Sequence, residues 1–168
     1  MVKYQLPQGT GILKKGKKYQ DLKPLQQQIY DLVSDPINGP LFFAENCIYV
    51  NRNGLIKFEP LEYQREMLFL FTNGDRNIIM VTRQGGKTTN SAIYILWYAL
   101  FNDYKQILIT SQDERSANEI LTTIKLMYEN CPNFLKRGCV KVNESELWFD
   151  NKSRIFSRST TSKAARGL

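Results

Sequence analysis

The sequence predicts an α/β fold in which a parallel sheet is flanked by helices. Two short, unbroken apolar runs, residues 77–82 (NIIMVT) and 106–110 (QILIT), have the length and composition of strands buried on both faces of such a sheet. A segment with helical periodicity follows each run, at residues 87–101 and 114–130. Strands that alternate with helices at these spacings are typical of βαβ units.

The chain after residue 130 follows a different pattern. Short extended segments are predicted at 139–142, 147–149 and 155–159. The turn sequences NES and DNKS separate them. We therefore expect a β-meander inserted into the α/β plan.

Residues 1–58 are predicted to form a basic tail and lead-in helices. Helical periodicity covers residues 23–33, with Pro24 in the first turn, and a second short helix is expected at 42–46. The sequences Asp35-Pro36 and Asn38-Gly39-Pro40 are expected to end the first helical region, and the turn NRNG precedes an extended LIKFEP. The tail carries a lysine cluster, which is either a solvated surface or an arm that touches DNA: Lys14, Lys15, Lys17 and Lys18.

A further amphipathic helix is predicted at residues 61–71, closed by Asn73-Gly74. Its expected inward positions are Leu61, Met67, Leu68 and Phe71. We place the second unit of the chain at residues 59–168, because the strand–helix alternation lies there.

Composition limits the classes of function. The chain has 168 residues, a net charge of +7 and a pI of about 9.3, which favours polyanionic partners such as nucleic acid. It has no histidine and three cysteines without a CxxC pair, which excludes His-ligated metal sites and His-based triads and favours a reducing compartment. No signal peptide and no membrane-length apolar run is present, so we expect a soluble, intracellular chain.

A phosphate-binding loop is predicted between the first apolar run and the helix that follows it. Gly86-Lys87-Thr88 matches the second half of the P-loop pattern, Gly-x4-Gly-Lys-Ser/Thr, whereas Val81 occupies the position of its first glycine. Gly85 and Gly86 let the backbone N–H groups approach phosphate oxygens, and the helix dipole adds to the attraction. Lys87 would contact the β- and γ-phosphates and Thr88 would ligate Mg²⁺. The alternative is an ordinary helix start with Thr88 near the cap.

Arg83 lies inside this loop. A guanidinium there could contact the γ-phosphate and stabilise charge in the transition state. A salt bridge to a neighbouring acidic side chain is the alternative.

The loop sequence Thr82-Arg83-Gln84-Gly85-Gly86-Lys87-Thr88-Thr89 resembles the deviant P-loop of the large terminase subunits of T4-like tailed bacteriophages, Ser/Thr-Arg-Gln-x-Gly-Lys-Thr with a non-glycine first position. This resemblance implies that ATP with Mg²⁺ binds here, that Lys87 and Arg83 are catalytic, and that Arg83 acts as the arginine in cis. It implies ATP contacts from Arg83, Gln84, Gly85, Gly86, Lys87, Thr88 and Thr89, with Thr88 as the metal ligand.

Upstream, the segment 60–64 (PLEYQ) resembles the adenine-recognition segment of terminases, often Pro-Tyr-Gln, and departs from it at Leu61 and Glu62. A Tyr63 ring can stack on adenine, and a Gln64 amide can donate to and accept from its edge. Both side chains could instead lie on a helix face that packs on the sheet.

The resemblance covers residues 24–168, including the segments 97–101, 132–135, 148–151 and 164–167 (AARG). It implies a RecA/ASCE-like P-loop NTPase fold with an inserted β-hairpin, in an ATP-driven motor that threads double-stranded viral DNA into a procapsid. A homo-oligomeric ring, the portal protein and the small terminase subunit are the implied partners. The host cytoplasm is the implied location.

Hydrolysis in this family also needs an apolar strand that ends in Asp-Glu, the Walker B motif, where Asp holds Mg²⁺ through water and Glu activates the attacking water. Asp150 ends the most similar string, but Asn151 follows it and its flanks suggest a turn. The resemblance places this strand after the Arg-Gly element, so we expect a partial ATPase domain, truncated before Walker B, with the nuclease domain absent. Such a fragment would bind ATP weakly and hydrolyse it poorly.

Two further functions stay open on the sequence. A superfamily-2-like helicase or translocase also places a glutamine motif upstream of a P-loop. A non-hydrolysing nucleotide- or DNA-binding remnant is the non-enzymatic alternative, with the lysine cluster, Lys152, Arg154 and Arg158 as candidate DNA contacts, each of which could equally be a solvated charge.

Overall fold

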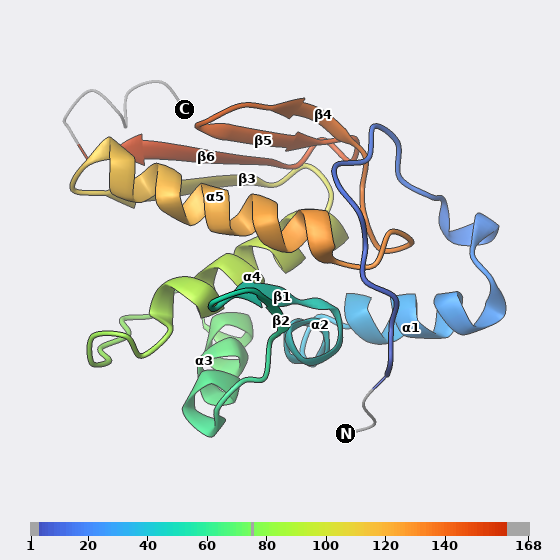
Figure 1. The fold of residues 1–168 in the computed structure, drawn as a ribbon, viewed down its shortest axis with the longest axis horizontal. Helices are drawn as coiled ribbons and strands as arrows, with labels where there is room; N and C mark the ends of the chain where they lie inside the picture. Colours follow the sequence, from blue (N-terminus) through green and yellow to red (C-terminus); the bar gives the residue numbers. More distant parts are fainter. Residues whose placement is uncertain (1–3, 75, 161–168) are drawn as a thin grey trace.

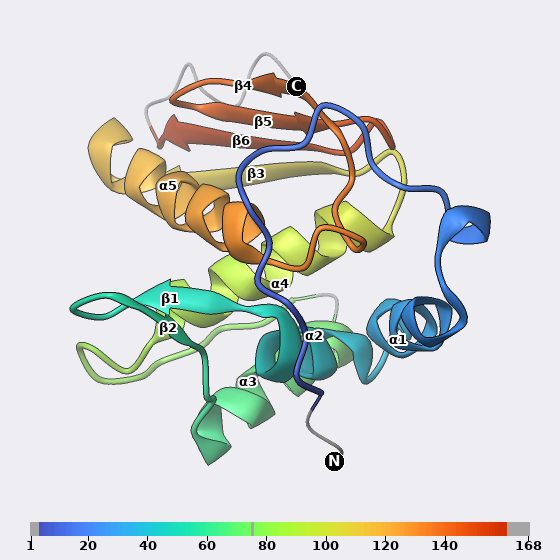
Figure 2. The same ribbon diagram turned by 45° about the vertical axis from the view of Figure 1, so that its right-hand side comes forward.

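The computed structural model describes residues 4–74 and 76–160, which form a mixed α/β fold in stacked layers (Figure 1). A four-stranded sheet forms the upper layer, and α5 packs across one of its faces. The helix α4 lies beneath α5, and α1, α2, α3 and a small hairpin form the lower layer (Figure 2). The upper elements are β3 (Gln106–Ser111), α5 (Glu114–Asn130), β4 (Cys139–Val142), β5 (Glu146–Phe149) and β6 (Arg154–Ser159).

The sheet has the order β3-β6-β5-β4 and is mixed. β3 and β6 run parallel, with Gln106 opposite Arg154, whereas β5 is antiparallel to both β6 and β4. The predicted β-meander is therefore confirmed. The expectation of a parallel sheet holds only for the β3–β6 pair among the described strands, because tight turns between β4, β5 and β6 impose antiparallel pairing.

The lower layer confirms most of the expected elements. It contains the 3-10 turn η1 (Tyr19–Asp21), α1 (Pro24–Ser34), α2 (Gly39–Cys47), β1 (Tyr49–Asn51), β2 (Leu55–Lys57) and α3 (Glu62–Asn73). The first helix ends at Ser34, directly before Asp35-Pro36, as expected. Gly39 and Pro40 in addition begin α2, since proline is favoured in a first turn. β1 was not anticipated; it pairs with β2 across the predicted turn.

The inward face of α3 was predicted in part. Met67 and Leu68 are buried, and Phe71 is half-buried with its ring 5.2 Å from that of Tyr94. Leu61 is 59% exposed, so its inward placement was wrong. The reason is its position: Leu61 is the extended residue before the first turn, where the helical period does not apply.

The predicted strand at residues 77–82 is not formed. In both ribbon views this segment lies below α4, whereas the sheet lies above it (Figures 1 and 2). Ile78 and Met80 are 95% and 91% exposed. An apolar run becomes a buried strand only where a neighbouring strand is available to pair with it, and no described strand lies beside this segment.

The strand β3 is formed as predicted but is not buried on both faces. It pairs with β6 on one side and with no described strand on the other, and Leu108 remains 36% exposed. β3 is thus an edge strand of the described sheet.

One continuous core joins the layers. It contains apolar side chains from the lead-in helices, α4, α5 and the sheet, among them Val33, Phe43, Leu96, Leu121 and Ile155. Across the described ranges, 4–74 and 76–160, no helix combines the length and hydrophobicity that a membrane span needs. The Arg-Gly element at 164–167 and the basic end of the chain lie outside the described residues.

Candidate functional site

The predicted phosphate loop forms a tight turn that leads directly into α4 (Lys87–Phe101). Gln84 and Gly86 adopt left-handed backbone angles, with φ of 66° and 73°. A left-handed residue followed by a helical one turns successive N–H groups toward one side, as in backbone sites that bind anions. Gly86 is the N-cap of α4 and supplies no side-chain cap, and Thr88 lies two residues after it, in the first turn of the helix. The loop therefore leads into a helix start as both alternatives require, and phosphate binding stays a prediction.

Lys87 folds back across the loop. Its Nζ donates a hydrogen bond to the carbonyl oxygen of Val81 at 3.2 Å. The loop is thereby closed into a ring with an ammonium group at its rim, beside the N–H groups at the positive end of the helix dipole. Val81, the residue that departs from the common pattern, thus contributes a backbone acceptor that needs no particular side chain.

Gln64 supports the loop from below. Its side chain is buried, and its Oε1 accepts a hydrogen bond from the backbone N–H of Leu61 at 3.0 Å. A Cβ atom added to Gly86 would lie 2.3 Å from Nε2 of Gln64, so this amide would have to shift to admit a larger residue. In this conformation Gln64 positions the loop. Contact of its amide with an adenine edge stays a prediction.

Asn90 is a supporting residue that sequence reasoning missed. It is fully buried on α4, and its Nδ2 donates to the carbonyl oxygen of Gln64 at 2.8 Å. Asn90 therefore ties the start of α4 to α3, so that the loop and the Tyr63 segment are held as one unit. The sequence signal was a polar residue one turn into an otherwise apolar helix.

Tyr63 and the loop border the same hollow. A pocket of about 510 Å³ is lined by Tyr63, Met80, Val81, Thr82 and Gly85. This volume lies within the range of small-molecule sites. Tyr63 is 38% exposed, so part of its ring remains available to a ligand. The structure thus brings together the two segments that the sequence singled out separately.

The other predicted loop residues lie at the surface. Arg83, Gln84 and Thr88 are exposed, and Thr89 is half-buried. Arg83 forms no ion pair with any residue in the described part of the chain, so the alternative of a structural salt bridge is not realised there. Contacts of Arg83 and Thr88 with a phosphate and its metal ion stay predictions.

Asp150 lies at the opposite end of α4. Asn151, its neighbour, donates to the carbonyl oxygens of Ala99 and Asn102 at the C-terminus of that helix. The loop is at the N-terminus, and a helix of 15 residues spans roughly 22 Å. Asp150 therefore cannot act on a phosphate held by the loop. Its carboxylate instead accepts backbone N–H groups from Gly16 and Gly138.

Two of the candidate DNA contacts are already engaged. Arg154 stacks on the ring of Trp148, with its guanidinium carbon 4.1 Å from the ring centroid, and Arg158 pairs with Glu146 at 3.0 Å. The hydrogen bond from Lys141 is the main cause that holds the pKa of Glu146 below its usual range, and the contact with Arg158 adds to it. These arginines order the outer face of the sheet.

The cysteines offer no reactive centre. Cys47 and Cys131 are buried and free, and burial raises the pKa of the Cys131 thiol to about 12, which keeps it neutral. The described residues contain no cluster of three side chains suited to a metal ion. No known protein-family model matches the chain.

Proposed function

We propose that the loop at residues 81–88 binds the triphosphate of ATP, with the adenine in the hollow beside Tyr63. The observation that carries this proposal is the fold of Lys87 across an uncapped helix N-terminus. Backbone N–H groups, a helix dipole and one ammonium group converge there, which is the set of donors that a phosphate needs.

Each residue of the loop then has a chemical role. Lys87 exchanges its contact with the Val81 carbonyl for phosphate oxygens, at little cost in side-chain order because it is already folded over the loop. Arg83 supplies a second cation to the terminal phosphate. Thr88 offers the hydroxyl that would ligate Mg²⁺, an ion that neutralises phosphate charge.

The wider function rests on the resemblance to terminase large subunits. On that basis we propose that ATP binding powers translocation of double-stranded phage DNA into a procapsid, by a homo-oligomeric ring that works with the portal protein and the small subunit. The mixed α/β fold and the order loop–α4–β3–α5 are compatible with a P-loop NTPase. A helicase or translocase fragment has the same elements, and no observation in the structure favours it.

Turnover by these 168 residues is a separate question. The candidate carboxylate, Asp150, lies at the far end of α4, so the chain would bind ATP without a carboxylate from this turn to activate water. We therefore expect binding with little steady hydrolysis, which is the behaviour of the non-hydrolysing alternative.

The experiment is a calorimetric titration of the purified chain with ATP in the presence of MgCl₂. Lys87→Ala is expected to weaken ATP binding about 10- to 100-fold, because a hydrogen bond to a charged group contributes roughly 1.5–3 kcal/mol. The matched control is Lys23→Ala, which removes an exposed lysine before α1, far along the chain from the loop.

Equal ATP affinity of the wild type and Lys87→Ala would contradict the proposal. Binding of tripolyphosphate, which has no adenine, distinguishes the phosphate-binding part of the site from the adenine-binding part. Tyr63→Ala should weaken ATP binding but leave tripolyphosphate binding unchanged, whereas Lys87→Ala should weaken both. Steady multi-turnover hydrolysis that Lys87→Ala abolishes would contradict the expectation of binding without turnover.

A further inference from the structure

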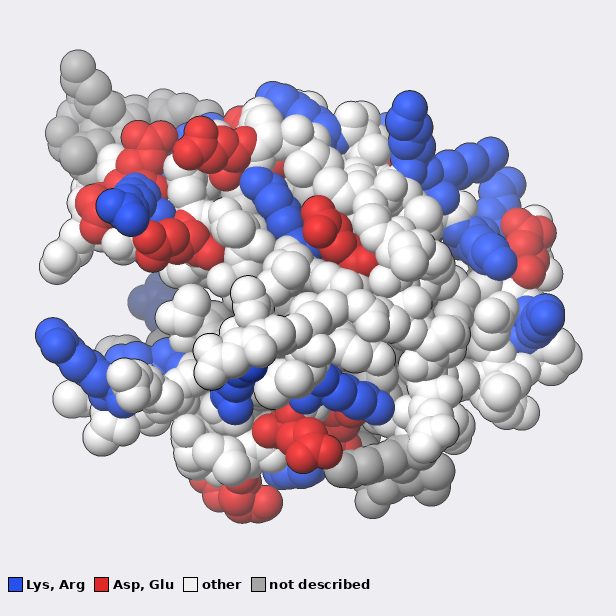
Figure 3. Space-filling view, in the orientation of Figure 1, with Lys and Arg blue, Asp and Glu red and all other residues white. Residues whose placement is uncertain are grey.

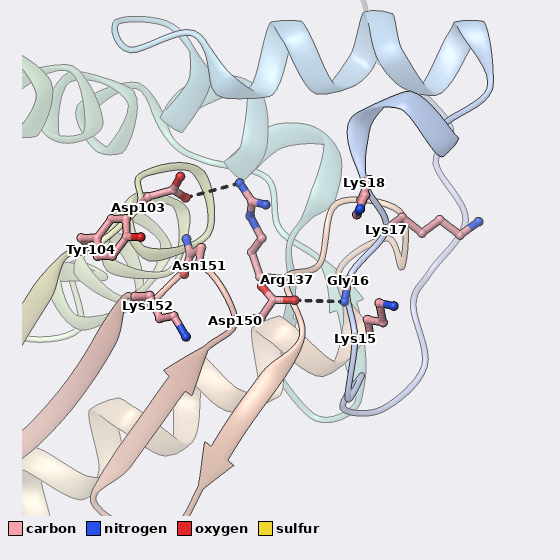
Figure 4. A pocket seen from close by; sticks show the side chains of 10 residues that line it. All are labelled: Lys15, Gly16, Lys17, Lys18, Asp103, Tyr104, Arg137, Asp150, Asn151 and Lys152. Atoms are coloured by element: carbon pink, nitrogen blue, oxygen red, sulfur yellow. Dashed lines mark hydrogen bonds and ion pairs between the residues drawn. The ribbon is translucent and has the colours of Figure 1, made fainter.

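A second cationic site lies at the C-terminal end of α4. A pocket of about 340 Å³ opens there. Segments far apart in the sequence line this pocket, as Figure 4 shows. The lining residues are Lys15, Gly16, Lys17, Lys18, Asp103, Tyr104, Arg137, Asp150, Asn151 and Lys152. In that view Lys15, Lys17 and Lys18 lie on the opposite side of the pocket from Tyr104 and Lys152, and the side chain of Lys17 extends outward, away from them.

The lysine segment is held in place and is not a free tail. Asp150 accepts the N–H of Gly16 at 3.3 Å, and the N–H of Cys139 donates to the carbonyl oxygen of Leu13 at 2.7 Å. A Cβ atom added to Gly138 would lie 2.7 Å from the Lys14 carbonyl oxygen, so the two segments are in close contact. The lysines therefore keep a defined position relative to the β5–β6 turn.

A buried lysine fastens the same segment further upstream. Lys136 donates to the carbonyl oxygens of Gly11 and Glu129 and to the side chain of Asn133. Gly9 also donates to the carbonyl oxygen of Asn130 at 3.0 Å. The chain before the lysine cluster is thus docked along the end of α5.

The charges in this pocket are unequal. Its acidic groups are already engaged, since Asp150 accepts two backbone N–H groups and Asp103 pairs with Arg137 at 3.6 Å. No described residue forms an ion pair with the four lysines of the lining, Lys15, Lys17, Lys18 and Lys152. The space-filling view shows Lys and Arg side chains gathered over this side of the molecule, at the upper right (Figure 3).

Two residues that line the pocket, one of them aromatic, have a strained backbone conformation. Tyr104 and Lys152 both have positive φ, at 59° and 68°, a conformation that costs a non-glycine residue free energy and is enriched at binding sites. The N–H of Tyr104 donates to the carbonyl oxygen of Asn151 at 3.1 Å, which holds the strained turn. The Tyr104 side chain is 77% exposed, so its ring is free to stack.

We propose that this pocket binds the phosphodiester backbone of a nucleic acid, with the lysines on phosphates and Tyr104 against a sugar or base. Lysines on a docked backbone segment beside an exposed aromatic ring are a combination that nucleic-acid grooves use. The lining contains no aliphatic side chain that could enter a bilayer, which disfavours an anionic membrane. The site is distinct from the loop that we assign to ATP, and the inference does not depend on that assignment.

The test measures fluorescence anisotropy of labelled 20-nucleotide DNA, single-stranded and duplex, without any nucleotide present. Lys17→Glu/Lys152→Glu should weaken binding at least about tenfold and reduce the slope of log K against log salt by about 2. The matched control, Arg52→Glu/Arg115→Glu, changes the net charge equally at exposed positions outside the pocket and should stay within about twofold of the wild type.

Tyr104 gives a second, uncharged readout. Tyr104→Ala should weaken binding several-fold and Tyr104→Phe should retain it, because a stacked ring is the group that matters. A Tyr104→Ala effect confined to single strands identifies a base as the stacking partner, and an effect on both forms identifies a sugar contact. Circular dichroism confirms that the variants are folded.

Several outcomes would overturn the proposal. The pocket and control variants could lose equal amounts of DNA affinity, or the wild type could fail to bind DNA. The wild type could also bind polyglutamate as tightly as it binds DNA. Binding to anionic vesicles without binding to DNA would also overturn it and identify a membrane surface. Because ATP is absent throughout, failure here and failure of ATP binding at Lys87 are distinguishable.

Discussion

The two ends of α4 both carry cationic character, but its physical origin differs between them. At its N-terminus the cationic character comes from backbone N–H groups, a helix dipole and the single ammonium of Lys87. At its C-terminus the dipole is negative, and the charge comes from lysine side chains that two distant segments bring together. A backbone-built site depends on glycine and local geometry, whereas a side-chain-built site depends on long-range docking.

A second helix start sharpens this contrast. α5 also begins near the same end of the molecule, but Asp113 caps it, with Oδ1 accepting the Ser116 N–H at 2.7 Å. The start of α4 has no side-chain cap. An internal carboxylate caps the start of α5, whereas no side chain caps the start of α4, where we propose that phosphate binds.

The largest effect is expected from Gly86→Ala. The added Cβ would meet Nε2 of Gln64 at 2.3 Å, and the left-handed backbone would cost a further 1–2 kcal/mol or so. ATP binding measured by calorimetry should be lost, while DNA binding at the opposite end of α4 should persist. Gly11→Ala is the matched control, since Gly11 has φ of 60° with no atom within 4 Å of an added Cβ. If Gly86→Ala binds ATP like the wild type, the loop is not the phosphate site.

An intermediate effect is expected from Asp150→Ala. The change removes a negative charge from a basic pocket, which by charge alone would strengthen DNA binding. We expect weaker binding instead, by a few-fold, because Gly16 and Gly138 lose their shared acceptor and the lysine segment is held less firmly beside the pocket. Fluorescence anisotropy with labelled DNA measures the change.

Asp150→Asn separates position from charge. The amide oxygen can still accept the two N–H groups, so DNA affinity should match or exceed that of the wild type. Tighter DNA binding by Asp150→Ala than by the wild type would show that the lysines need no anchoring, and would remove the distinction between the two ends of α4.

The smallest effect is expected from the contribution of the Asp113 cap of α5 to stability. Hydrogen bonds from the Ser116 backbone N–H and then from its hydroxyl lower the pKa of Asp113 below its ordinary value of 3.8. The ionised cap therefore stabilises the fold fully above that value, and the stabilisation is lost as the pH falls through the lowered pKa. Melting temperatures of the wild type and Asp113→Asn should differ at pH 7 and converge in acid. A constant difference across this range would exclude a titrating cap.

The helices on either side of the loop were predicted from the sequence more completely than the sheet. The residues of the loop, the helix that follows it and the Tyr63 segment all lie where their local patterns indicated. Asn90 was missed, because a lone polar residue in an apolar helix does not reveal which carbonyl it meets. The role of Gln64 shifted toward support of the loop, since burial against Gly86 is a tertiary property.

The sheet shows why the remaining predictions failed. Residues 77–82 and 106–110 are equally apolar, yet only the second run found a parallel partner, β6. Strand formation requires hydrogen bonds from another segment, so composition alone cannot separate these two cases.

What the sequence determined by itself is local: helix periods, turn residues, and the glycines and lysine of the loop, because these depend on spacing along the chain. The tertiary structure alone decided which apolar run enters the sheet, that Asp150 lies at the far end of α4, and that Lys15 meets Lys152 across one pocket. Such contacts join residues that are far apart in the sequence, and they are set by the packing of whole helices and strands.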